Sequence, residues 1–251
     1  MPRFQVVWLA GAGSRSGRAF ALFDGLMRYL TVAGGYDWSD FVEASYRTAP
    51  DGRPLPYTED DSTRPLAAAT AAVARGLEWL RRESGRPLHL VGWSLGGVVF
   101  FDAAAALVAA DPSWARDLGA LVTLASPLLG VDLDGLTLIG ELAAGPVGAD
   151  LTRRAADAAA QERVRRDAAR LRAAGVRLVT IAAADDAVVS PADALLPAPG
   201  PEPSAFILSP RRRPGAFDPA SVLGHWDLPR DPVCWQRVLA ALGPAEARAG
   251  A

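Results

Sequence analysis

Residues 88–101 read LHLVGWSLGGVVFF, a stretch in which a single serine separates two apolar runs. The first run, within 86–92, has the length of a buried strand, and the second, within 95–110, has the length of a helix. Ser94 has a glycine two residues away on either side, so the chain can make a sharp strand-to-helix turn there. A serine on such a turn holds its hydroxyl clear of the sheet, where it can react. The stretch therefore predicts a reactive serine at the end of a strand.

Short apolar runs alternate with helical patterns along the whole chain. The predicted strands are 4–10, 40–47, 86–92, 118–125, 176–183 and 204–209. The predicted helices are 18–31, 60–85, 95–110, 150–174 and 231–243. Strands that alternate with helices pair in parallel and are covered by helices on both faces. The sequence therefore predicts one α/β domain over residues 1–251, with six mostly parallel strands.

The composition excludes several classes of protein. The sequence contains no lysine, which excludes Schiff-base enzymes and P-loop ATPases because both need that amine. It contains no asparagine and therefore no N-glycosylation site. Cys234 is the single cysteine, so no internal disulfide or cysteine-rich metal site can form.

Charge and hydropathy also limit the partners. The net charge is −2 without a long basic run, which favours neither nucleic acid nor an anionic membrane. The apolar run near the N-terminus, within 4–10, is too short for a signal-peptide core or a membrane span. We therefore expect a cytoplasmic protein without an integral membrane segment.

A serine nucleophile needs a base, and the sequence offers two histidines. His89 lies inside the predicted strand 86–92, where a packed core residue is expected. His225 lies in a polar loop after the last predicted strand. From such a loop it can reach the carboxyl ends of the strands, where sheets of this class place their sites. His225 is therefore the predicted base.

The base needs a carboxylate to orient it, and three aspartates follow the predicted strand 176–183. Asp185 and Asp186 come directly after the strand, and Asp193 is expected in a short helix. Asp186, which begins the stretch DAVVSP, is preferred over Asp185.

Two backbone amides are expected to bind the oxyanion that forms when serine attacks a carbonyl. One is the amide of Leu95, directly after the serine, and the other comes from the loop after the first strand. That loop reads LAGAGSRSG over 9–17, and Ala12 is its best donor. Its glycines also suggest a dinucleotide-binding loop, but Ser16 stands where that motif needs its third glycine.

With these stretches placed, the chain resembles the α/β-hydrolase superfamily over nearly its whole length, especially the serine esterases and lipases. LVGWSLGG is similar to their nucleophile elbow, and TLASPLLG resembles the segment that follows the strand after this elbow. DAVVSP is similar to their acid loop, and GHWDLPRDPVCW is similar to their histidine loop and final helix. The order Ser94, Asp186, His225 is also theirs. Two features depart from the pattern: Ala10-Gly11 replaces the usual His-Gly, and two leading antiparallel strands are absent. The resemblance implies a compact six-stranded α/β-hydrolase fold.

The resemblance implies ester hydrolysis through a Ser94–His225–Asp186 triad, with no metal or organic cofactor and a small-molecule acyl ester as substrate. Segment 127–151 would form a small cap over the site, although ordinary packing also explains its apolar residues. Trp93 and Trp226 flank the catalytic residues and would line the substrate pocket. Trp226 could equally anchor its loop.

Other functions remain compatible with the same fold. A type II thioesterase would use the same triad, and cofactor-free haloperoxidases and acyltransferases share the architecture. A haloalkane dehalogenase is disfavoured because it needs an aspartate in place of Ser94. A hydrolase fold without activity could serve as a small-molecule receptor.

Overall fold

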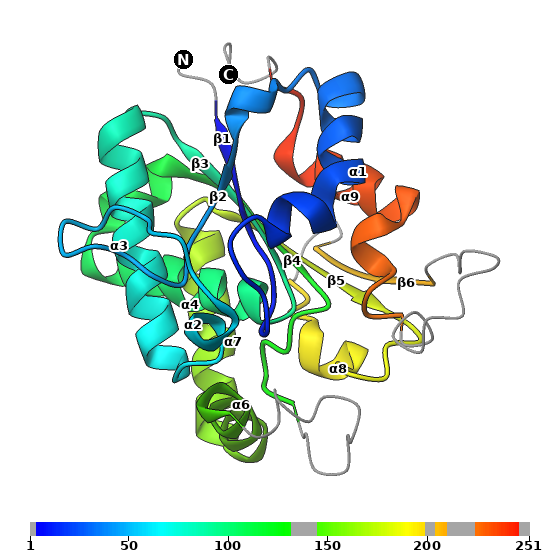
Figure 1. Ribbon diagram of the computed structural model, residues 1–251. Coiled ribbons are helices and arrows are strands. Elements are labelled where there is room, and N and C mark those ends of the chain that lie inside the picture. The colour runs from blue at the N-terminus through cyan, green and yellow to red at the C-terminus, as the bar shows by residue number, and fades with distance from the viewer. Residues whose placement is uncertain (1–3, 132–144, 199–203, 210–223, 246–251) are drawn as a thin grey trace.

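The computed structural model describes residues 4–131, 145–198, 204–209 and 224–245, and it contains one six-stranded sheet (Figure 1). The strands are β1 (Gln5–Leu9), β2 (Phe41–Glu43), β3 (Leu88–Trp93), β4 (Leu118–Leu124), β5 (Arg177–Ala183) and β6 (Ala205–Leu208). They lie in the order β2-β1-β3-β4-β5-β6, and all five neighbouring pairs are parallel. All six predicted strands are confirmed.

Helices cover both faces of this sheet (Figure 1). The longer helices are α1 (Arg18–Gly34), α3 (Leu66–Ser84), α4 (Leu95–Ala110), α6 (Pro146–Ala156), α7 (Ala158–Ala173) and α9 (Pro232–Leu242). The short ones are η1 (Trp38–Asp40), α2 (Glu59–Ser62), η2 (Pro112–Asp117), α8 (Pro191–Ala194) and η5 (Leu228–Arg230). Apolar residues of α3, α4 and α7 form one core cluster with one face of the sheet, and those of α1 and α9 form a second cluster with the other face.

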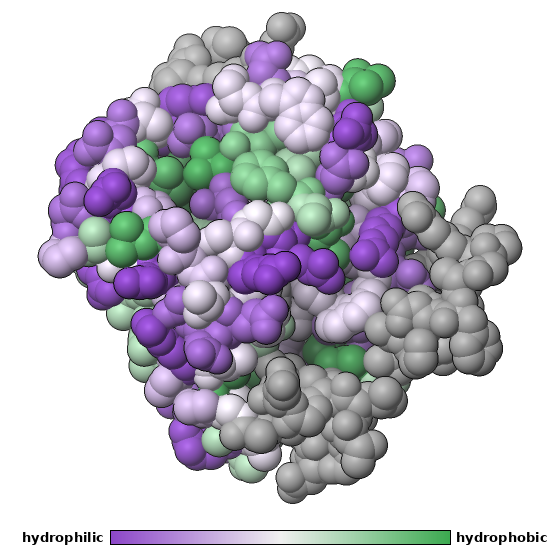
Figure 2. Space-filling model, in the orientation of Figure 1, coloured by the Kyte–Doolittle hydropathy of each residue, from purple (hydrophilic) through white to green (hydrophobic). Residues whose placement is uncertain are grey.

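The alternation of side chains along β3 assigns its residues to these two cores. Leu88 and Leu90 pack toward α3 and α4, whereas Val91 and Trp93 pack toward α1 and α9. Every residue of β3 is buried, which explains why this central strand reads as an uninterrupted apolar run. Figure 2 shows one face of the molecule, where hydrophilic residues predominate on the left and a band of apolar residues lies above the centre.

Two predicted helices are each divided in the structure. The predicted helix 150–174 is split at Asp157, whose carboxylate accepts hydrogen bonds from the amides of Ala159 and Ala160 and so caps the start of α7. The predicted helix 60–85 is split before α3, which starts directly after Pro65. Of the predicted cap 127–151, residues 132–144 lie outside the described residues.

The described residues contain no helix that is both long and apolar enough to cross a membrane.

Cys234 provides a test of the packing around α9. Its side chain is completely buried, and this burial, together with nearby Asp231, raises the pKa of the thiol. We expect the folded protein not to react with a thiol reagent such as dithionitrobenzoate, because the reagent needs an accessible thiolate. After denaturation one thiol per chain should react. Rapid labelling of the folded protein would contradict the packing of α9 described here.

Candidate functional site

Ser94 lies at the turn between β3 and α4 in a backbone conformation that side chains rarely adopt. Its φ is 55° and its ψ is −128°, in a region that favours glycine. Such a conformation costs on the order of 1–3 kcal/mol and persists only where the surroundings impose it. Here the Ser94 amide donates to the carbonyl of Leu124 at 2.9 Å, and the Ser94 carbonyl accepts from Gly97 at 3.1 Å. The predicted strand-to-helix turn is therefore present and strained.

The two glycines of the motif are required by the packing of this turn. A Cβ atom on Gly92 would lie 2.5 Å from the amide nitrogen of Gly97. A Cβ atom on Gly96 would overlap the carbonyl oxygen of Leu9 at the end of β1. Both obstacles are backbone atoms, which cannot move aside without disrupting the start of α4 or the end of β1. The sharp turn thus explains the spacing GxSxG in physical terms.

The loop after β1 passes directly against Ser94. A Cβ atom on Gly11 would lie 2.8 Å from the Cβ and 3.2 Å from the Oγ of Ser94. Ala12 follows this glycine, and Leu95 begins α4 on the other side of the serine. The two amides predicted to bind an oxyanion therefore belong to segments that adjoin Ser94.

Tyr46 holds this loop through a contact that the sequence analysis does not predict. Its buried hydroxyl donates to the carbonyl oxygen of Ala10 at 2.5 Å. Burial raises the pKa of Tyr46 well above its usual value, so the hydroxyl keeps the proton that it donates. The predicted strand 40–47 ends in the structure at Glu43, which frees Tyr46 to reach the loop. The hydrogen bond between Tyr46 and Ala10 could have been anticipated only by placing the end of this strand at Glu43.

His225 and Asp186 form a buried pair. The Nδ1 atom of His225 lies 2.7 Å from Oδ2 of Asp186, and the two side chains are 1% and 0% exposed. The other carboxylate oxygen, Oδ1, accepts from the amides of Val188 at 2.8 Å and Val189 at 2.9 Å. With the carboxylate oxygen as the acceptor, Nδ1 is the donor in this pair. The opposite ring nitrogen, Nε2, then has a free lone pair and can accept a proton.

Trp93 links this pair to the serine. Its indole N–H donates to the carbonyl oxygen of His225 at 3.0 Å, and the two rings lie 4.9 Å apart. Trp226 packs on both, with its ring 4.5 Å from that of Trp93 and 4.9 Å from that of His225. Ser94 follows Trp93 directly in the chain, so the structure brings Ser94, His225 and Asp186 to the carboxyl edge of the sheet. Trp93 is buried and Trp226 half-buried, and their role in binding substrate stays a prediction.

Solved structures share this architecture. Lipase B from Aspergillus fumigatus matches with a TM-score of 0.60 and 17% identity, over 97% of this chain and 54% of that chain. Phospholipase PlaB from Legionella pneumophila matches with a TM-score of 0.64 and 12% identity, over 98% of this chain and 60% of that chain. This chain has the α/β-hydrolase fold. The chain is less than two thirds as long as either of these two proteins.

A further structure with this α/β-hydrolase fold is similar in length. The mature form of the lipase BlEst2 from Bacillus licheniformis matches with a TM-score of 0.54 and 17% identity, over 96% of this chain and 92% of that chain. No protein-family model matches the sequence, and none of the curated proteins matches it. At these identities the likeness concerns the fold alone.

The other histidine has a structural role in this hydrolase fold. His89 is buried in β3, where its Nδ1 accepts from the amide of Ala120 at 2.9 Å. Its ring also stacks on Phe4, with the centroids 4.1 Å apart. The prediction that His89 is a packed strand residue is confirmed.

The two remaining aspartates lie outside the buried pair. Asp193 lies in the short helix α8, as predicted, and its carboxylate accepts from the hydroxyl of Ser190 at 2.6 Å. Asp185 is exposed, and its carboxylate packs against Gly224, the residue before His225. Asp186 is therefore the acid whose carboxylate contacts the His225 ring.

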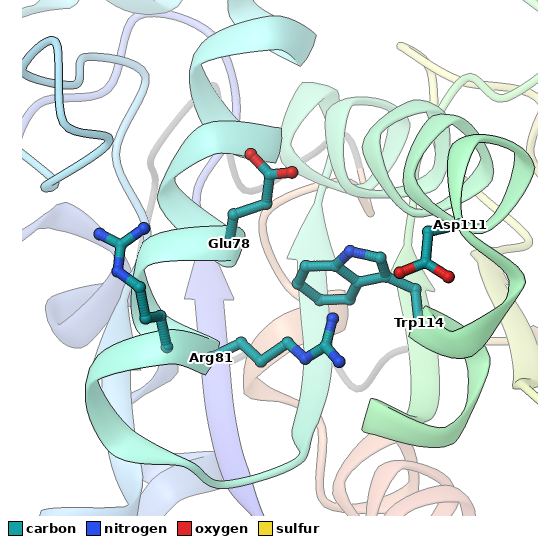
Figure 3. Close-up of a pocket in the computed structure, with 5 residues that line it drawn as sticks. Glu78, Arg81, Asp111 and Trp114 are labelled. Atoms are coloured by element: carbon teal, nitrogen blue, oxygen red, sulfur yellow. The ribbon is translucent and has the colours of Figure 1, made fainter.

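A cavity of about 480 Å³ lies far from these residues, between the end of α3 and η2 (Figure 3). It is lined by Glu78, Arg81, Arg82, Asp111 and Trp114. Arg81 pairs with Asp117 at 2.6 Å and lies over the ring of Trp114. Because η2 leads into the amino end of β4, this cavity is at the opposite edge of the sheet from Ser94 and is not the candidate site. Within the described ranges, no group of three or more His, Cys, Asp or Glu residues could hold a metal ion.

The choice between the two neighbouring acids can be tested. If the chain hydrolyses esters, as its resemblance to serine esterases implies, Asp186→Asn should slow the reaction by roughly 10²-fold or more, because an amide no longer holds His225 in the tautomer that accepts a proton. Asp185→Asn should change the rate only a few-fold. Steady-state kinetics of the two purified variants would decide. If Asp185→Asn were the more damaging change, the acid would be Asp185 instead.

Proposed function

We propose that this protein is a serine hydrolase that cleaves carboxylic esters. The observation that carries the proposal is the buried His225–Asp186 pair, which Trp93 attaches to the strained turn that holds Ser94. The fold supports it, because three structures with the same architecture are named as lipases or a phospholipase.

In the first half of the proposed reaction, the enzyme becomes acylated. Ser94 Oγ attacks the carbonyl carbon of the ester while Nε2 of His225 takes the hydroxyl proton. Asp186 keeps the imidazole oriented and stabilises its charged form. The amides of Ala12 and Leu95 donate to the oxyanion, and the N-terminus of α4 adds its positive dipole end. When the carbon–oxygen bond breaks, the alcohol leaves with the proton from His225.

In the second half, water releases the acid. Nε2 of His225 takes a proton from the water, and the hydroxide attacks the acyl carbon bound to Ser94. The second oxyanion forms in the same place and is stabilised by the same amides. When the bond to Ser94 Oγ breaks, His225 returns the proton to the serine. The free acid leaves and the enzyme is regenerated, and each step uses only side chains and backbone amides of this chain and water.

A fluorophosphonate probe tests this proposal directly, since it reacts only with an activated serine. We expect one probe per chain, on the peptide that contains Ser94, when the labelled protein is digested and measured by mass spectrometry. p-Nitrophenyl esters and acyl-coenzyme A thioesters should then be compared as substrates. A strong preference for the thioesters would make the protein a thioesterase. A folded protein without labelling would favour the non-catalytic receptor.

A further inference from the structure

The indole of Trp93 touches three of the segments on which the proposed function depends. It belongs to the residue directly before Ser94, and its N–H donates to the carbonyl oxygen of His225. Its Cε3 atom also lies against the loop after β1, because a Cβ on Gly11 would be only 3.2 Å away from it. No other side chain described above contacts both the base and the oxyanion loop while adjoining the nucleophile in the chain.

The indole is held rigidly in this place. Trp93 is 7% exposed and belongs to the core between the sheet and the helices α1 and α9. Its hydrogen bond with His225 is buried, and Trp226 closes the cluster by packing against both rings. A buried carbonyl that loses its donor is costly, so the bond strongly favours one position of the His225 backbone.

We propose that Trp93 is a positioning residue that sets the place of His225 relative to Ser94, rather than a residue that binds substrate. This inference rests on the proposed function. The carboxylate of Asp186 fixes the orientation of the imidazole ring, but the ring is carried by its backbone. The indole N–H fixes that backbone from the side of the nucleophile. A displacement of the base by about 1 Å can cost on the order of 10²-fold in rate.

Trp93→Phe removes the N–H and keeps an aromatic ring in the core. We expect kcat for a p-nitrophenyl ester and the rate of fluorophosphonate labelling to fall together by about 10-fold to 100-fold, while KM changes less than threefold. A residue that lines the substrate pocket would instead raise KM. The split between kcat and KM therefore separates positioning from binding.

Trp8→Phe is the matched control. Trp8 lies in the same core cluster and is completely buried, and in the part of the chain that the structure describes its indole N–H has no hydrogen-bond partner. Both variants lose the same atoms from one core, but Trp93→Phe also leaves the His225 carbonyl without its donor, so thermal unfolding should show the larger loss of stability for Trp93→Phe. Labelling rates are therefore compared per folded molecule. Only Trp93→Phe should lose labelling rate per folded molecule.

Trp93→His is a rescue variant, because an imidazole carries a ring nitrogen at the position equivalent to the indole N–H. We expect it to recover part of the labelling rate lost in Trp93→Phe. The inference is overturned if Trp93→Phe labels as fast as Trp8→Phe, if its defect lies in KM, or if Trp93→His is folded and no faster. A wild-type protein that does not label at all would overturn the proposed function, and this inference with it.

Discussion

Replacing Ser94 by alanine should abolish nearly all ester hydrolysis and leave the protein folded. The proposed reaction has no other nucleophile, and loss of the serine in a triad costs on the order of 10³-fold or more in kcat. The fold should tolerate the change, because alanine has the same Cβ as serine and is no more strained at a φ of 55°. Steady-state kinetics with a p-nitrophenyl ester measure the loss, and circular dichroism checks the fold.

Ser126→Ala is the control for this experiment. Ser126 is also a buried serine at the carboxyl end of a central strand, just after β4, and its hydroxyl donates to the carbonyl of Leu124. Unlike Ser94, Ser126 does not itself have a positive φ, although Ala125 before it does. Within the part of the chain that the structure describes, its hydroxyl makes no hydrogen bond to the His225–Asp186 pair. The Ser126→Ala protein should hydrolyse the ester at a rate close to that of the wild type. Turnover at that rate by Ser94→Ala would remove the proposed nucleophile.

The sequence was sufficient for the sheet and for the edge at which the site lies. Buried parallel strands are apolar on both faces, so runs such as 118–125 and 176–183 stand out without any knowledge of their partners. Residues that directly follow such strands must lie at the carboxyl edge. Ser94 and Asp186 were predicted there for this reason.

The sequence was not sufficient for contacts between distant segments. The indole of Trp93 meets the carbonyl of His225, and the hydroxyl of Tyr46 meets that of Ala10, yet neither acceptor is distinguishable from any other backbone carbonyl in a sequence. The sequence therefore predicts that Trp93 binds substrate, and the only basis for this is that it adjoins the nucleophile. Asp157 is a local example, because it lies inside a continuous pattern of alanine and charged residues that reads as one helix.

The fold also leaves the substrate open. An α/β-hydrolase sheet fixes where a nucleophile, a base and an acid meet, but the acyl group is selected by the segments that cover this edge. The substrate comparison proposed above measures this preference.

Replacing His225 should be as damaging as replacing Ser94, because the proposed mechanism uses the serine and the base as one unit. We expect His225→Ala to lower kcat by on the order of 10³-fold or more. The alanine also leaves the buried carboxylate of Asp186 without its partner, which costs stability. His225→Gln is therefore measured beside it, since glutamine can donate to Asp186 but cannot accept the serine proton. Both variants should be inactive, and the glutamine variant should be the more stable.

The pH dependence separates His225 from His89. A protonated imidazole cannot accept the serine proton, so wild-type hydrolysis should be lost as the pH falls and should reach a plateau as the base becomes neutral. His89→Gln should keep the shape of this profile and lose only stability, because His89 bonds to the amide of Ala120 and stacks on Phe4 inside the sheet. The chain has two histidines, so no third can replace His225. An active His225→Ala protein with the same acid limb would therefore exclude the Ser94–His225–Asp186 mechanism altogether.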